Sequence, residues 1–129
     1  MEKPALEFTE LEHAAVEQIL TMSLAGIDAV RRQFEASRVV KREYTGVGFY
    51  TDISVPPSIP RIPDDQELRE HLIAGARVRS APGELILFQL WITGGYLSCL
   101  EATTTKGLSW PDEQEMEVVP IRFREKGEG

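Results

Sequence analysis

The run from residue 42 to residue 52 combines the side chains of this chain that are best suited to recognition. It contains Tyr44, Gly46, Gly48, Tyr50 and Asp52. In a strand, residues two apart share a face, so Tyr50 and Asp52 fall on one face with Gly48, which leaves open surface beside them. Tyrosine beside exposed backbone suits the binding of a protein or a flat ligand. The same glycines also fit a purely structural bulge, with Tyr50 lying under a helix.

Two further side chains could join this run in a site. Glu101 with Asp52 would supply the two carboxylates that acid–base catalysis requires, although each could instead pair with an arginine, such as Arg42, Arg77 or Arg79. Trp110 precedes a proline, where a tryptophan either plugs the end of a core or anchors a partner. The candidate binding residues are therefore Tyr44, Gly46, Gly48, Tyr50, Asp52, Glu101 and Trp110.

No other pattern in the sequence predicts catalysis, a metal site or a cofactor. His13 and His71 are the only histidines, and neither has a partner at the spacing of a metal-ligand pair. Cys99 is the only cysteine. It alternates with Leu97 along one expected strand, so we expect both side chains to face the same side, with Cys99 acting as a small apolar residue. We therefore expect no catalytic residues and favour binding over an enzymatic role.

The charge of the chain restricts its partners. Its 129 residues carry a formal net charge of -7, with a sequence pI of about 4.9. This surface disfavours nucleic acid and anionic membranes, and it suits a basic protein. Basic residues gather locally between positions 31 and 42, where they could hold a phosphate or balance nearby acids. A single cysteine indicates a reducing compartment, and the first residues lack the pattern of a secretory signal, so we expect a cytoplasmic protein.

The periodicity predicts helices first and strands afterwards. Thr9 and Glu12 form a capping-box pattern ahead of an apolar helical stripe, and a second stripe runs from Ile27 to Phe34. These two segments indicate a helical hairpin or one bent helix. Further along, we expect a proline-rich extended segment over 56–63, a helix over 66–74, and strands over 38–45, 47–55, 76–80, 84–92, 96–102 and 118–123.

The strand over 84–92 is the most hydrophobic segment of the chain. Ile86, Phe88 and Leu90 fill one face, while Leu85, Leu87 and Trp91 nearly fill the other. A strand that is apolar on both faces is expected in the middle of a sheet that is covered on both sides. We therefore predict an α+β fold in which an N-terminal helical hairpin packs on one antiparallel sheet of about five or six strands. Residues 1–124 would form this single domain, and residues 125–129 a disordered tail.

Three pieces of the sequence resemble a family of short uncharacterised bacterial proteins. They are the run from 42 to 52, the pair of segments Gly95-Tyr-Leu97 and Leu100-Glu101, and Trp110-Pro111. The resemblance covers most of the chain up to Pro111, and it implies no activity. Small acidic helix-plus-sheet proteins of this kind are also similar, at the level of the fold, to some toxin-immunity proteins.

Three hypotheses about function follow from the sequence. The leading one is a non-enzymatic interaction or inhibitor domain, which binds a protein through its acidic surface and the region of Tyr50, Asp52 and Trp110. The alternative is a small-molecule-binding domain or minor enzyme with a closed cleft lined by Tyr44, Tyr50, Asp52 and Glu101. A symmetric homodimer through the edge strand 118–123 is the third, although Pro120 within that strand opposes edge pairing.

Overall fold

The computed structural model describes residues 6–121 of the chain. Two helices come first, and strands dominate the rest of the chain. In chain order the elements are α1 (Glu10–Leu20), α2 (Ile27–Ala36), β1 (Arg38–Tyr44), β2 (Gly48–Ser54), α3 (Gln66–Glu70), β3 (Ile73–Val78), β4 (Ala81–Thr93), β5 (Tyr96–Thr104), the 3-10 turn η1 (Glu113–Glu115) and β6 (Met116–Val119). The predicted order of helices before strands is confirmed.

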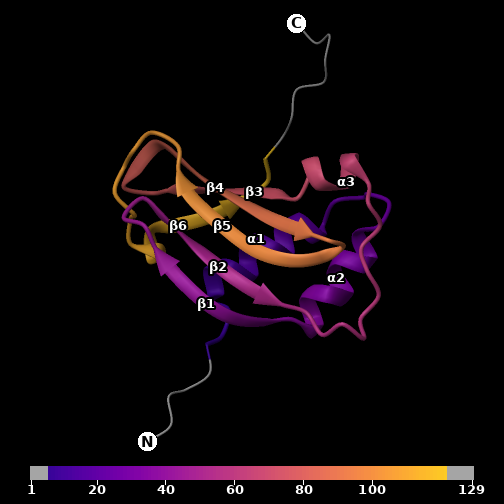
Figure 1. Cartoon of the computed structure of the whole chain (residues 1–129). Coiled ribbons are helices and arrows are strands. Elements are labelled where there is room, and N and C mark those ends of the chain that lie inside the picture. The colour runs from indigo at the N-terminus through magenta and orange to yellow at the C-terminus, as the bar shows by residue number, and fades with distance from the viewer. Residues whose placement is uncertain (1–5, 122–129) are drawn as a thin grey trace, which may run out of the picture.

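The six strands form one antiparallel sheet in the order β1-β2-β5-β4-β3-β6. Both long helices lie on the same side of this sheet, behind the strands in Figure 1. α1 packs on β3 and β6, and α2 packs on β5. This arrangement is the predicted α+β fold, with an N-terminal helical pair packed on a single open sheet.

The core fills the space between the helical pair and the sheet. The apolar stripes of α1 and α2 meet the inward side chains of the four inner strands, and the largest buried apolar groups include Val16, Ile19, Val30, Phe49, Phe88, Leu97 and Leu100. Burial of such side chains stabilises the fold by about 1.5–3 kcal/mol each. The helical pair is therefore held to one face of the sheet by a continuous apolar layer.

A buried carboxylate joins the start of α1 to the first hairpin. Glu12 closes the predicted capping box, because its side chain accepts a hydrogen bond from the backbone of Thr9, 2.8 Å away. The same fully buried carboxylate forms an ion pair with Arg42 of β1 and accepts a hydrogen bond from the Thr51 hydroxyl of β2. One side chain thus caps a helix and fixes that helix against two strands.

A buried amide does the same for α2. The Nε2 of Gln33 donates hydrogen bonds to the carbonyls of Pro60 and Gly95, at 3.0 and 2.8 Å. Its Oε1 accepts a hydrogen bond from the backbone N–H of Leu97, at 2.9 Å. Gln33 is fully buried, and these three bonds tie α2 to both the proline-rich segment and the β4–β5 hairpin.

Several element boundaries differ from the prediction, most of all those of α3 and of the last strand. The helix expected over 66–74 ends at Glu70, and strand β3 begins at Ile73. This segment pairs with β4, and the Leu72 carbonyl accepts a hydrogen bond from Leu90 N–H, so sheet pairing overrides the local helical pattern. The last strand is β6, at the sheet edge as expected, but it ends before Pro120. The expected tail 125–129 lies outside the described residues.

The sheet is not covered on both sides, which corrects the expectation for the strand over 84–92. Its inward side chains are fully buried, but the opposite face of β4 carries Leu85 and Trp91, both of which are exposed. Within residues 6–121, both long helices lie on the other side of the sheet (Figure 1). The apolar second face of β4 therefore belongs to the molecular surface.

Glu12→Ala should destabilise the protein strongly. The change leaves the Arg42 guanidinium buried without its partner and removes the helix cap, which together should lower the free energy of unfolding by about 3–5 kcal/mol. The matched control is Glu17→Ala, because Glu17 forms an exposed ion pair with Arg31 at 3.8 Å and should contribute about 0–1 kcal/mol. Urea denaturation measures both. Equal losses in the two variants would contradict the structural role of Glu12.

Candidate functional site

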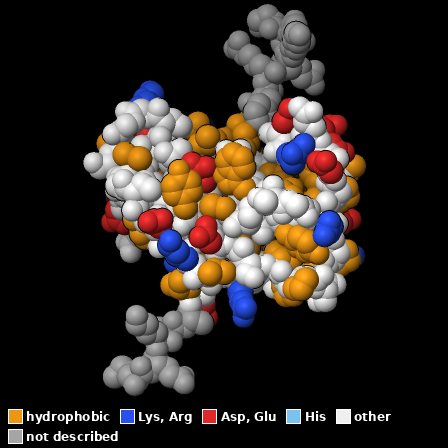
Figure 2. All heavy atoms as spheres, in the orientation of Figure 1, with side chains coloured by type: hydrophobic (Ala, Val, Ile, Leu, Met, Phe, Trp, Pro, Cys, Tyr) orange, Lys and Arg blue, Asp and Glu red, His pale blue; other side chains and the backbone are white. Residues whose placement is uncertain are grey.

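The face of the sheet that the helices leave uncovered carries a group of polar and aromatic side chains. We call it the open face, and Figure 2 views the molecule from this side, with hydrophobic groups next to acidic ones over the middle strands. Strand alternation places on it the side chains that point away from the core. Across β1, β2, β5 and β4 these include Arg38, Lys41, Glu43, Tyr50, Asp52, Ser54, Cys99, Glu101, Thr103, Leu85, Leu87, Gln89 and Trp91.

The strand register brings three of the predicted site residues together on the open face. Tyr50 of β2 lies directly opposite Glu101 of β5, and Asp52 lies opposite Cys99. Asp52 and Glu101 are therefore diagonal neighbours on adjacent strands. Neither carboxylate forms an ion pair with an arginine among the described residues, in contrast to the alternative considered from the sequence.

Glu101 lies between two exposed aromatic side chains. The indole Nε1 of Trp91, on β4, donates a hydrogen bond to Glu101 Oε1 at 3.1 Å. On the other side, Tyr50 of β2 lies directly opposite Glu101 of β5 in the strand register. Tyr50 and Trp91 remain 43% and 44% exposed, so neither ring is used to fill the core. We call these three residues the aromatic–carboxylate cluster.

The cluster is electrostatically negative. The negative charge of Glu101 is the largest cause that raises the pKa of Tyr50 above its usual value, which keeps the phenol neutral. Glu43 lies opposite Tyr50 on the outer side, and Asp52 is next along β2. Lys41, opposite Asp52, pairs with Glu43 at 3.9 Å, and Arg38 lies opposite Ser54, one open-face position beyond Asp52. Arg69 lines the hollow beside Trp91 and pairs with Asp64 at 3.3 Å. Because neither Glu101 nor Asp52 forms an ion pair among the described residues, the centre of the cluster favours a cationic ligand.

Cys99 lies on the open face, which corrects the expectation that it would share a side with Leu97. A bulge in β5 aligns Leu97 with Ile92 and Cys99 with Trp91, so the two residues face opposite sides. Partial burial, followed by the charges of Asp52 and Glu101, raises the pKa of the Cys99 thiol to about 11. A thiol that stays protonated at neutral pH is a poor nucleophile.

The other two aromatic candidates lie on the opposite side of the sheet. Tyr44 contacts Phe49 of the core, with ring centroids 5.6 Å apart, and its side chain remains 55% exposed at the sheet edge. Trp110 meets Phe49 edge-on at 5.3 Å, and its Nε1 donates a hydrogen bond to Glu113 at 3.1 Å. The structure therefore places Tyr44 and Trp110 at the end of the core, apart from the cluster on the open face.

The two candidate glycines shape the backbone near the site. Gly46 has a φ of 93° in the β1–β2 turn, where its carbonyl accepts a hydrogen bond from Trp110 N–H. Gly48 is buried, which corrects the expectation that it leaves open surface beside Tyr50. A Cβ there would overlap the backbone carbonyl of Ala102, so glycine allows β2 and β5 to approach each other closely. Both positions serve the fold that presents Tyr50.

Trp91 is the residue of the site that sequence reasoning missed. Its alternation with Leu85 and Leu87 indicated a covered apolar face, and the sequence therefore predicted a core residue. Trp91 follows Leu90 directly, so the two side chains fall on opposite faces of the strand, and Leu90 is the buried one. Because the chain has few helices with which to cover two faces, the face that carries Trp91 could have been predicted to be exposed. A tryptophan on an uncovered face has the residue type that is most enriched at binding hot spots.

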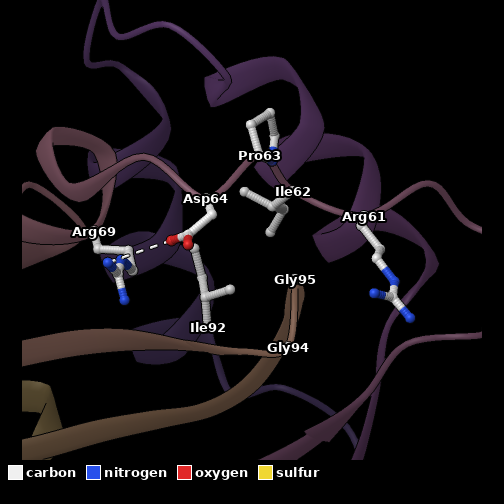
Figure 3. A pocket seen from close by; sticks show the side chains of 8 residues that line it. All are labelled: Arg61, Ile62, Pro63, Asp64, Arg69, Ile92, Gly94 and Gly95. Atoms are coloured by element: carbon white, nitrogen blue, oxygen red, sulfur yellow. Dashed lines mark ion pairs between the residues drawn. The ribbon is translucent and has the colours of Figure 1, made fainter.

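The best-formed hollows lie elsewhere or only adjoin the cluster. One, of about 430 Å³, is lined by Asp64, Arg69, Gly95 and their neighbours. In Figure 3, Asp64 and Arg69 point toward one another, at 3.3 Å, while the Arg61 side chain points away from them, so the two guanidinium groups do not converge on one ligand. A second hollow, of about 540 Å³, lies between Trp91 and residues of α3.

Metal ligands, membrane-spanning helices and known relatives give no functional assignment for this protein. Among residues 6–121, no group of three or more histidine, cysteine or acidic side chains could hold a metal ion. None of the helices that the structure describes is both long enough and apolar enough to cross a membrane. Comparisons with protein-family models, with curated proteins and with solved structures give no match. The resemblance to a bacterial family stays a prediction.

Glu101→Gln should lower the pKa of Tyr50. The substitution removes the negative charge that opposes formation of the phenolate, so the pKa should move down toward its ordinary value of 10.0. Ring-carbon chemical shifts followed by NMR against pH would report each tyrosine separately. Tyr44 serves as the internal control, because burial is the main cause of its own raised pKa. An unchanged Tyr50 titration would contradict the contact with Glu101.

Alkylation of Cys99 by iodoacetamide should be slow at neutral pH. With a pKa of about 11, about one thiol in a thousand is ionised at pH 8, and the rate should rise with a midpoint near 11. Asp52→Asn should speed the reaction at pH 8, because it removes one of the charges that oppose the thiolate. As Cys99 is the only cysteine, mass spectrometry reports it without background. A midpoint near 8.5 would contradict this placement.

Proposed function

We propose that this protein is a non-enzymatic protein-interaction domain of the inhibitor or immunity type, which binds a basic protein through the open face. The observation that carries the proposal is the aromatic–carboxylate cluster: Tyr50 and Trp91, both more than two-fifths exposed, flank Glu101 on an uncovered sheet. Large aromatic residues supply most of the affinity at protein interfaces, and they are costly to leave in water without a partner.

The charge around the cluster supports a basic partner. Glu43, Asp52 and Glu101 all lie on the open face, and the chain as a whole carries a net charge of -7. Complementary charge increases the rate of encounter and disfavours partners of the wrong sign, while the aromatic groups limit dissociation. An acidic rim around exposed rings is therefore suited to selecting a basic protein surface.

The shape of the surface favours this proposal over the cleft alternative. That alternative needs Tyr44, Tyr50, Asp52 and Glu101 around one closed cavity, but Tyr44 lies on the core side of the sheet and the other three on the open face. Neither of the two hollows described above is lined by any of these four residues. A broad face is the usual geometry for protein recognition, whereas small ligands need concavity.

The same proposal includes the cellular setting. We infer a cytoplasmic protein of bacterial origin, in line with the resemblance of the segment 42–52 and with a single cysteine that forms no intrachain disulfide. A homodimer through β6 is less favoured, because that edge strand has four residues and Pro120 follows directly.

Affinity purification from the source organism tests the proposed function. The tagged protein should capture a stoichiometric basic protein that is released as salt is raised. Tyr50→Ala and Trp91→Ala should each weaken the complex by roughly 2 kcal/mol, or about 30-fold, because each removes an exposed aromatic anchor. Glu101→Arg should also abolish capture, since it reverses the charge at the centre of the cluster.

The control is Glu17→Arg, which reverses an exposed charge on α1, an element of the helical layer on the other side of the sheet. This variant should retain the partner. A partner that is lost with Glu17→Arg but kept with the three open-face variants would place the interface on the helical side and overturn the proposal. A preparation without any partner at low salt would also count against it.

A further inference from the structure

The carboxylate of Glu101 has unused hydrogen-bonding capacity. A carboxylate offers about four lone-pair positions on its two oxygens, and among the described residues the side chain that donates to Glu101 is the Trp91 indole. No arginine or lysine of residues 6–121 forms an ion pair with Glu101. The carboxylate is thus held by a neutral donor and has no ion-pair partner in this part of the chain.

The indole also restricts the position of the carboxylate. Glu101 is only partly exposed, it accepts the hydrogen bond from Trp91 of β4, and Tyr50 of β2 lies opposite it on the other side. An acceptor that is already ordered loses little conformational entropy when a ligand binds. The aromatic rings beside it can offer their faces to a flat cation.

We propose that the partner of this protein delivers an arginine side chain to the aromatic–carboxylate cluster, where the guanidinium binds Glu101 and stacks against Trp91 or Tyr50. This inference rests on the proposed function, and it names the group that the open face recognises. A guanidinium is planar, presents paired N–H donors that match a carboxylate, and stacks on aromatic rings. A lysine ammonium can supply the charge but neither the paired donors nor the flat face.

The neighbouring charges strengthen the preference for a cation at this point. Asp52 is the diagonal neighbour of Glu101, and Glu43 lies opposite Tyr50. Lys41, the cation beside them, is paired with Glu43. An incoming guanidinium therefore meets three acidic groups. The nearby cations within residues 6–121 are Lys41 and Arg69, which are paired with Glu43 and Asp64, and Arg38 at the start of β1.

The chain contains a matched control for this arrangement. Trp110 also donates an indole hydrogen bond to a glutamate, Glu113, at the same 3.1 Å, but on the core side of the sheet and with its ring packed edge-on against Phe49. The two tryptophan–glutamate pairs thus differ in the exposure of the indole ring, on which the inference depends. The Trp91 ring is exposed on the open face, whereas the Trp110 ring is half-buried.

Titration with capped tripeptides tests the inference without a known partner. The probes are acetyl-Gly-Arg-Gly-amide, the corresponding lysine peptide and the corresponding citrulline peptide, in which the neutral side chain keeps the shape of arginine. The two tryptophan indole N–H resonances are followed by ¹H–¹⁵N NMR of the full chain. The arginine peptide should shift the Trp91 resonance with a Kd on the order of millimolar, and leave the Trp110 resonance in place.

The variants and the other two peptides decide the specificity. The lysine peptide should bind about tenfold more weakly than the arginine peptide, and citrulline should give no shift, because the paired charged donors are lost. Glu101→Gln should weaken arginine binding about tenfold, while Glu113→Gln should leave it unchanged. Equal binding of arginine and lysine, or arginine binding that survives Glu101→Gln, would overturn the inference.

The inference and the proposed function can fail separately. If the arginine peptide leaves Trp91 unshifted while affinity purification still yields a basic protein that depends on Trp91 and Glu101, the arginine contact is wrong and the interaction surface stands. If the arginine peptide binds but no protein partner is captured, the cluster recognises the guanidinium as such and the proposed interaction domain is wrong. A second variant, Trp91→Leu, should also abolish the preference for the arginine peptide over the lysine peptide. Because this variant lacks the Trp91 indole, peptide binding is followed by the backbone amide shifts of strand β5.

Discussion

The buried carboxylate of Glu12 is the interaction on which the arrangement of layers depends. Placing a full charge in the core is unfavourable unless every acceptor position is satisfied, and here a helix N-terminus, a guanidinium and a hydroxyl do so together. These donors belong to three different elements, so the charge is tolerated only when α1, β1 and β2 are in register. The ion pair with Arg42 thus specifies the geometry of the fold more than it adds to its stability.

The position of the helical pair on one side of the sheet determines which side chains the other side of the sheet exposes. Both long helices lie over the core and α3 has only five residues, so within residues 6–121 no helical layer covers the apolar outer face of β4. Strand alternation then places Trp91, Glu101 and Tyr50 on adjacent strands of this face. The proposed binding surface is therefore a consequence of how the core is closed, with the same pleat serving both sides of the sheet.

Local patterns in the sequence predicted the fold well and the site in part. The capping box at Thr9 and Glu12, the helical stripes and the shared face of Tyr50 and Asp52 all depend on near neighbours, and the structure has each of them. The contact of Glu12 with Arg42 spans thirty residues, and Arg42 looked like one member of a surface basic group. Likewise, a single bulge in β5 moved Cys99 to the other face, and no local pattern marks where a bulge falls.

Gln33 has a consequence for how freely the loops of this protein can change in evolution. Its amide contacts only main-chain atoms: the carbonyls of Pro60 and Gly95 and the N–H of Leu97. Main-chain groups are present whatever the side chain, so the hydrogen bonds of Gln33 specify the path of the proline-rich segment but not most of its residue types. Relatives of this protein could therefore carry very different residues across the neighbouring loop positions and still keep the same path, provided that one glutamine remains.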